Sequence, residues 1–170
     1  MSQGRDRLRV PMKDRLSDIH VTANVTLPSP EELVREIPCG EKDAAFMVRS
    51  REDVRRSIFG ENGKFLVVAG PCSIHDPEAA MEYAVKLKEE AKRIEKDVFV
   101  IMRVYFEKPR TTVGWKGYIN DPGLDESYDI NRGLRLARQL LAKLTELQIP
   151  CGTEFLDTIS PQYVADLVSW

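Results

Sequence analysis

Four basic side chains gather in one short stretch, residues 101–117 (IMRVYFEKPRTTVGWKG). They are Arg103, Lys108, Arg110 and Lys116, against a single carboxylate, Glu107. Arginine offers planar two-point hydrogen bonding to carboxylate or phosphate oxygens, and lysine offers a compact charge. Because the whole chain has a formal net charge of -2, this local excess of positive charge predicts an anion site. The alternative is a solvated loop, but Arg103 lies within an apolar run, where an unpaired cation is costly.

Two further positions carry residue types that can do chemistry. Cys72 follows Gly-Pro at the end of an apolar run, and such a thiol can be a metal ligand, a nucleophile or a small core residue. His75 makes a Cys-x-x-His pair with it, which alone does not define a metal site. Glu154 follows a weaker apolar run. It can act as a general base, hold a water molecule or pair with one of the cations.

The composition narrows the class of protein. The chain has 170 residues, 42% hydrophobic and 31% charged, which predicts one globular domain. A charge near neutral gives no electrostatic reason to expect a nucleic-acid partner. No run approaches the roughly 20 apolar residues of a membrane span, and residues 1–18 lack the apolar region of a secretory signal. Three cysteines form no even-numbered disulfide framework, so we expect a reduced, cytoplasmic setting.

The elements that position these residues alternate along the chain. Residues 1–28 predict an arm, and two short helices follow near 29–37 and 50–59. Apolar runs then predict strands at 65–69, 98–104 and 149–155, the first buried on both faces. Predicted helices follow each strand. These helices span residues 76–94, 127–147 and 160 to the chain end. Such alternation predicts an α/β fold with a parallel sheet.

The carboxyl ends of parallel strands share one edge, where sites gather. Cys72, the basic stretch and Glu154 each lie at the carboxyl end of one of the predicted strands. The second strand leads into a loop of about twenty residues, 105–126, and loops of that length are usually functional. The sequence therefore predicts that the three stretches converge on one face.

These residues form recognisable motifs. GPCSIHD at 70–76 and MRVYFEKPRTTVGWKG at 102–117 closely resemble type I 3-deoxy-D-arabino-heptulosonate 7-phosphate synthases. The match continues in INDP at 119–122, EFLD at 154–157, PQY at 161–163 and ADL at 165–167. The resemblance covers about residues 65–170.

The resemblance implies a (β/α)8 TIM barrel. The chain would hold its first three β/α units in residues 65–170, preceded by an amino-terminal extension in residues 1–64. The implied reaction condenses phosphoenolpyruvate with erythrose 4-phosphate and releases phosphate, the first step of the shikimate pathway to aromatic amino acids. Arg103 and Lys108 match residues that hold phosphoenolpyruvate, and Arg110 and Thr111 match the erythrose 4-phosphate site. Glu154 matches an acidic residue near the phosphoenolpyruvate pocket.

The resemblance also implies a divalent metal that acts as Lewis acid on the aldehyde oxygen. Cys72 matches the family's metal-binding cysteine. The other ligands lie beyond the end of this chain, and a set of Cys, His and carboxylates admits Mn, Fe, Co or Zn.

Family members are often inhibited by an aromatic amino acid and assemble into homo-oligomers through amino-terminal arms. The matching effector region here contains Phe155, Asp157, Pro161 and Gln162.

A complete barrel needs about 250 residues, so we interpret the chain as a fragment that is inactive alone, binds metal poorly and exposes a sheet edge. Two alternatives remain. One is a related synthase that uses arabinose 5-phosphate, although the KPRT motif favours erythrose 4-phosphate. The other is a non-catalytic phosphate-binding or regulatory fragment that pairs with another polypeptide.

Overall fold

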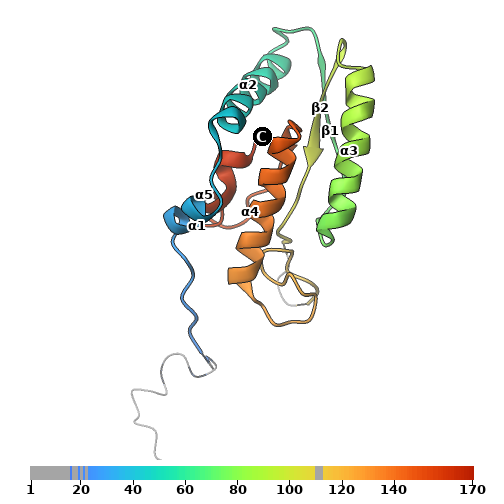
Figure 1. Cartoon of the computed structure of the whole chain (residues 1–170). Coiled ribbons are helices and arrows are strands. Elements are labelled where there is room, and N and C mark those ends of the chain that lie inside the picture. Colours follow the sequence, from blue (N-terminus) through green and yellow to red (C-terminus); the bar gives the residue numbers. More distant parts are fainter. Residues whose placement is uncertain (1–15, 17–18, 20, 22, 110–112) are drawn as a thin grey trace, which may run out of the picture.

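A computed structural model describes residues 16, 19, 21, 23–109 and 113–170, and it shows a parallel sheet with helices between the strands (Figure 1). In chain order, the elements are α1 (Pro30–Glu36), α2 (Glu41–Ile58), β1 (Phe65–Ala69), α3 (Pro77–Arg93), β2 (Val98–Arg103), α4 (Ile130–Glu146), β3 (Cys151–Gly152), α5 (Pro161–Val164) and the 3-10 helix η2 (Ala165–Leu167).

The three strands lie in the order β1-β2-β3, and both pairings are parallel. Phe65 is opposite Val98 at the start of the first pairing, and Arg103 is opposite Gly152 at the end of the second. The predicted parallel α/β arrangement is confirmed. As a result, the loops that follow the three strands leave the same edge of the sheet.

The predicted helix starts at Ser29 and Asp76 are confirmed. The Ser29 side chain accepts from the N–H of Glu32, whose carboxylate accepts from the N–H of Ser29 at 2.7 Å. This reciprocal pair satisfies two of the amide groups that a helix start leaves open. The Asp76 carboxylate accepts from the N–H groups of Glu78 and Ala79, and a proline occupies the first helical position after each cap.

The second helix begins nine residues earlier than predicted, at Glu41 after Gly40. Ser50, interpreted from sequence as a cap, lies inside α2 and is buried. Its hydroxyl lies 3.1 Å from the carbonyl of Met47 and 2.8 Å from the hydroxyl of Ser169. The prediction failed because this serine serves a tertiary contact across 119 residues.

Three other predictions need correction. First, β1 is not buried on both faces, because Phe65 is 72% exposed and Val68 is 48% exposed. Second, the third strand and the fourth predicted helix are shorter than expected, and α4 begins after the left-handed residue Tyr128. Third, the last helix ends at Leu167, and Trp170 then lies alongside β3. The N–H of Thr153 donates to the carbonyl of Trp170, and the N–H of Trp170 donates to that of Cys151.

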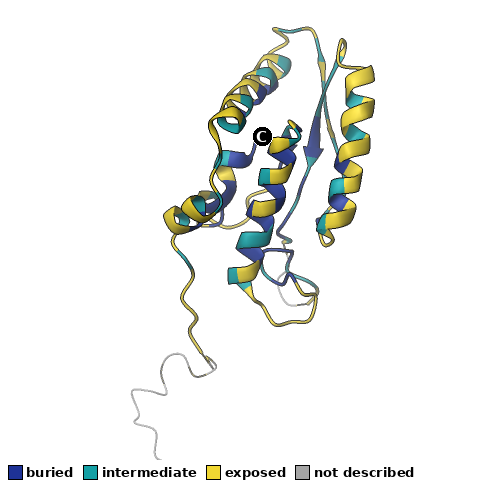
Figure 2. Cartoon of the chain, viewed as in Figure 1, coloured by how far each residue is buried: buried dark blue, intermediate teal, exposed yellow. Residues whose placement is uncertain are grey.

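The core is formed by buried residues of α3, α4, α5 and the strands, and the exposed residues lie on the outer sides of the helices (Figure 2). Leu134, Ala137, Leu141 and Leu144 form the buried stripe of α4. Arg138 interrupts this stripe, and its side chain is 0% exposed.

The Arg138 guanidinium donates hydrogen bonds to two separate segments of the chain. It donates to the carbonyl of Ile37 at 2.7 Å and to that of Tyr163 at 2.8 Å. It also makes a two-point contact with the carboxylate of Asp166, at 2.6 and 2.8 Å. Arg138 therefore joins the α1–α2 connection, α4 and the end of the chain.

A second arginine repeats this connection from α2. Arg51 donates to the carbonyl of Ala165 at 2.6 Å and to that of Val168 at 2.9 and 3.0 Å. These contacts join residues on the two sides of position 64, where the sequence predicts the boundary between the amino-terminal extension and the β/α units.

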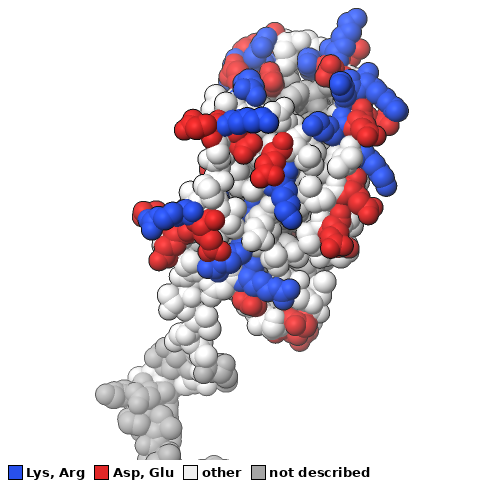
Figure 3. Space-filling model, in the orientation of Figure 1, with Lys and Arg blue, Asp and Glu red and all other residues white. Residues whose placement is uncertain are grey.

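The described surface has a mixed charge character. Figure 3 shows basic and acidic side chains interspersed over the helices on one face. Within the described part of the chain, no helix combines the length and apolar character needed to cross a membrane.

Candidate functional site

The carboxyl end of β2 is joined to the loop that follows β1 through Arg103. The Nε of this half-buried residue donates to the carbonyl of Pro71 at 3.0 Å, and a terminal nitrogen donates to that of Gly70 at 2.9 Å. Its Cζ lies 5.5 Å from the ring centroid of Tyr105. These contacts use two of the five guanidinium N–H donors, so the group is oriented and can still offer donors to an anion.

Gly70 is what allows this approach. It has φ +154, and a Cβ at this position would lie 2.7 Å from the carbonyl oxygen of Arg103. A side chain there would push the two loops apart, because real Cβ atoms do not approach that closely. The predicted convergence of the β1 and β2 ends is therefore present in the structure.

The loop that follows β2 carries Lys108 and Lys116 and is called the basic loop below. Its residues 106–108 are hydrogen-bonded to its residues 116–119. The N–H of Lys108 donates to the carbonyl of Lys116 at 3.0 Å, and the N–H of Ile119 donates to that of Phe106 at 3.3 Å. Gly117 has φ +110, and a Cβ there would lie 2.3 Å from the carbonyl oxygen of Phe106. The backbone leading into Lys108 is thus held against residues 116–119.

Helix α4 packs directly against the same loop. A Cβ on Gly133 would lie 1.9 Å from the carbonyl oxygen of Ile119. Glycine in a helix interior costs about 1 kcal/mol relative to alanine, and here it permits direct contact between the helix and the loop. The indole N–H of Trp115 adds a bond of 2.7 Å to the carbonyl of Asp121.

Cys72 and His75 are exposed in the loop after β1. This excludes the interpretation of Cys72 as a core residue and leaves its thiol accessible at the strand-end edge. Among the described residues, no group of three or more His, Cys, Asp or Glu side chains is placed to hold a metal ion. Cys72 would therefore supply one ligand and would need further donors from elsewhere.

Glu154 lies in the loop after β3, where the sequence placed it, and it is exposed. In the described part of the chain it makes no ion pair or hydrogen bond with the cations of the basic loop. Of the predicted effector region, Phe155 and Gln162 are exposed and Pro161 begins α5. The Asp157 carboxylate accepts from the N–H groups of Ile159 and Ser160, which lowers its pKa.

Glu107 has a role that sequence reasoning missed. Its carboxylate accepts from the hydroxyl of Ser160 at 3.0 Å and from the N–H of Leu156 at 3.4 Å, both in the segment after β3. Burial raises the pKa of Glu107, and these two hydrogen bonds act against that rise. No signal in the sequence links residues 107 and 160, which are 53 positions apart.

Arg110 and Thr111, predicted to bind the second phosphate, lie outside the described residues.

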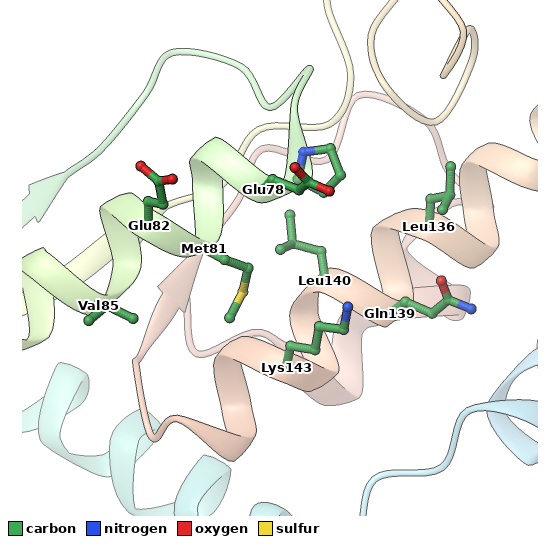
Figure 4. Close-up of a pocket in the computed structure, with 9 residues that line it drawn as sticks. Glu78, Met81, Glu82, Val85, Leu136, Gln139, Leu140 and Lys143 are labelled. Atoms are coloured by element: carbon green, nitrogen blue, oxygen red, sulfur yellow. The ribbon is translucent and has the colours of Figure 1, made fainter.

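A cavity of about 510 Å³ lies between α3 and α4, away from the strand ends (Figure 4). It is lined by the apolar side chains of Met81, Val85 and Leu140 and by the charged side chains of Glu78, Glu82 and Lys143. None of the predicted site residues lines it, so we take the strand-end edge, rather than this cavity, as the candidate site.

The structure is that of an α/β protein whose parallel strands are joined by helices. An oriented arginine and a basic loop lie at the carboxyl ends of the strands, where sites gather in such proteins. A sequence model of the DAHP synthetase I family matches residues 37–170. The chain belongs to this family.

Relatives agree with this assignment. The phospho-2-dehydro-3-deoxyheptonate aldolase of Corynebacterium glutamicum is 50% identical over 154 residues, which are 91% of this chain and 42% of that protein. The Tyr-sensitive phospho-2-dehydro-3-deoxyheptonate aldolase of Escherichia coli is 48% identical over 158 residues, 93% of this chain and 44% of that protein.

A solved structure is also similar. The phospho-2-dehydro-3-deoxyheptonate aldolase of Francisella tularensis superimposes with a TM-score of 0.83 at 54% identity, over 87% of this chain and 43% of that one. The chain thus spans a little over two fifths of the length of these relatives.

Proposed function

We propose that this chain is part of an enzyme that condenses phosphoenolpyruvate with erythrose 4-phosphate to give 3-deoxy-D-arabino-heptulosonate 7-phosphate and phosphate. The three β/α units would be the first of a (β/α)8 barrel, completed by further polypeptide. The observation that carries the proposal is the oriented Arg103 at the meeting point of the β1 and β2 ends, inside a sequence that belongs to this family.

The chemistry requires two phosphorylated anions side by side, and their repulsion must be offset by clustered cations. In the proposal Arg103 and Lys108 bind phosphoenolpyruvate, while Arg110 and Thr111 bind the phosphate of the acceptor sugar. Glu154 lies beside the phosphoenolpyruvate pocket. A C–C bond forms between C3 of phosphoenolpyruvate and the aldehyde carbon, with water consumed and phosphate released. These side chains contribute by positioning and charge stabilisation.

The proposal includes one metal ligand from the described residues. A thiolate at Cys72 suits Mn, Fe, Co or Zn, and the exposed thiol at the strand-end edge is accessible to an ion. Because no described group of three donors accompanies it, the remaining ligands belong to other parts of the polypeptide.

The regulatory part of the proposal concerns the segment after β3. We propose that Phe155, Asp157, Pro161 and Gln162 belong to the binding region of an aromatic amino acid effector. Relatives named Tyr-sensitive and Phe-sensitive support an effector of that class. Homo-oligomer formation and a cytoplasmic location complete the proposal.

The test measures phosphate release by the full polypeptide that the gene encodes, with phosphoenolpyruvate and either erythrose 4-phosphate or arabinose 5-phosphate. We expect turnover with the first sugar. Lys108→Ala should lower kcat/KM by about 100-fold, the order of magnitude of losing one positioned charge contact.

Lys143→Ala is the matched control, because Lys143 is an exposed cation that lines the α3–α4 cavity, away from the predicted site residues. Its kcat/KM should equal that of the wild type. Turnover only with arabinose 5-phosphate, or equal losses for the two lysine variants, would contradict the proposal. Absence of turnover with both sugars would favour a non-catalytic role.

A further inference from the structure

Glu107 lies immediately before Lys108 but faces away from the basic loop. Its side chain crosses to the segment after β3, where it accepts from the Ser160 hydroxyl and the Leu156 N–H. The residue is 9% exposed. A carboxylate removed from water in this way is costly unless its acceptors are satisfied, so the contact fixes the position of the Glu107 side chain.

The backbone at the same residue is held from the opposite side. Gly117 packs so closely that a Cβ on it would lie 2.6 Å from the Cα of Glu107. The next amide, that of Lys108, donates to the carbonyl of Lys116 at 3.0 Å. Residue 107 is therefore held between residues 116–117 of its own loop and the segment after β3.

The partner hydroxyl is itself oriented. The N–H of Ser160 donates to the Asp157 carboxylate at 3.0 Å. Ser160 precedes α5, but its side chain does not cap that helix, and its hydroxyl instead donates to Glu107. Ser160 is buried, so water does not compete readily for this bond.

We propose that Glu107 is a positioning residue: its bonds to Ser160 and Leu156 fix the Lys108 backbone and so direct the lysine ammonium towards the bound anion. This inference rests on the proposed function, in which Lys108 binds phosphoenolpyruvate. A lysine side chain is long and flexible, so a fixed Cα reduces the conformational entropy that is lost when its ammonium orders around a phosphate.

The sign of one substitution separates positioning from a charge effect. If Glu107 acted only through its negative charge, Glu107→Ala would strengthen the binding of an anion nearby, by Coulomb's law. If Glu107 positions Lys108, the same substitution weakens binding. Glu107→Gln keeps an acceptor oxygen for Ser160 and Leu156 while it removes the charge, so it should bind as the wild type does.

The experiment titrates phosphoenolpyruvate into the full polypeptide by calorimetry. We expect Glu107→Ala and Ser160→Ala each to raise Kd by about 10-fold, the equivalent of one hydrogen bond to a charged group. The double variant should bind no worse than either single one, since both remove the same contact. Glu107→Gln and Ser160→Thr should stay within about twofold of the wild type, which excludes general loss of fold as the cause.

Hydrogen exchange at the Lys108 amide gives a reading that does not depend on a ligand. Exchange should accelerate in Glu107→Ala and Ser160→Ala but not in Lys108→Ala. Unchanged or tighter phosphoenolpyruvate binding by Glu107→Ala and Ser160→Ala would overturn the inference. Unchanged binding by Lys108→Ala would instead contradict the assignment of Lys108 in the proposed function, and so the two failures can be told apart.

Discussion

Substitution of Arg138 by methionine should be among the more destabilising single changes in this chain. Methionine keeps the apolar stem that packs in the α4 stripe, but it removes the guanidinium that holds Ile37, Tyr163 and Asp166 together. The two carbonyl oxygens lose this donor in a region where the arginine side chain is 0% exposed. The Asp166 side chain is 38% exposed and can be rehydrated.

The magnitude follows from these differences. A buried acceptor that loses its partner costs about 1–3 kcal/mol, and removal of one member of a buried ion pair costs about 3–5 kcal/mol. Because Asp166 regains water, we expect the free energy of unfolding to fall by about 3 kcal/mol, near the lower end of that range. Asp166→Asn should cost a similar amount, since it leaves Arg138 as a buried charge with only neutral partners.

Arg135 is the matched control on the same helix. It pairs with Glu36 at 2.9 Å, but the two side chains are 36% and 45% exposed. Exposed pairs contribute about 0–1 kcal/mol, so Arg135→Met should change stability by less than about 1 kcal/mol. Urea unfolding followed by circular dichroism measures both variants. Equal losses for Arg138→Met and Arg135→Met would refute the view that Arg138 organises the core.

Two further predictions use the described residues. Burial raises the pKa of Glu107 above its ordinary value of 4.5, so the folded state binds this proton more tightly than the unfolded state. That contribution is complete below pH 4.5 and is lost as the pH rises through the folded pKa. As the pH rises through this pKa, the wild-type protein should therefore lose stability relative to Glu107→Gln. Urea unfolding at several pH values measures the difference, and a difference that does not change with pH would contradict the prediction. Iodoacetamide should modify the exposed Cys72 in the native protein and spare Cys151, since burial raises the pKa of Cys151 to about 12. Mass spectrometry of tryptic peptides measures both sites, and equal labelling would show that Cys151 is accessible.

Local signals in the sequence were sufficient for the architecture. The caps at Ser29 and Asp76 involve residues two or three positions apart, so their chemistry is visible in a short window. The parallel sheet followed from the alternation of predicted strands and helices, and the parallel pairing of its strands is confirmed.

Contacts between distant residues were not visible in the same way. Ser50 has the composition of a helix cap, but its partner Ser169 lies 119 positions away. Glu107 was counted against the neighbouring cations, although its hydrogen bonds are to residues 156 and 160. Arg138 did give a signal, because a cation inside an apolar helix stripe predicts a buried charge that needs a partner. Its partners could not be named from the sequence.

The contacts of α1 and α2 bear on the order in which the chain can fold during synthesis. Arg51 and Arg138 join this amino-terminal region to residues 163–168, and the Arg51 bonds span 114 and 117 positions. At ribosomal rates of about 5–20 residues per second, the partners of α2 emerge on the order of ten seconds after it. During that interval Leu33, Met47 and Val54, all buried in the folded chain, have no completed core to enter. A nascent chain stalled before residue 160 should therefore present these helices to chaperones.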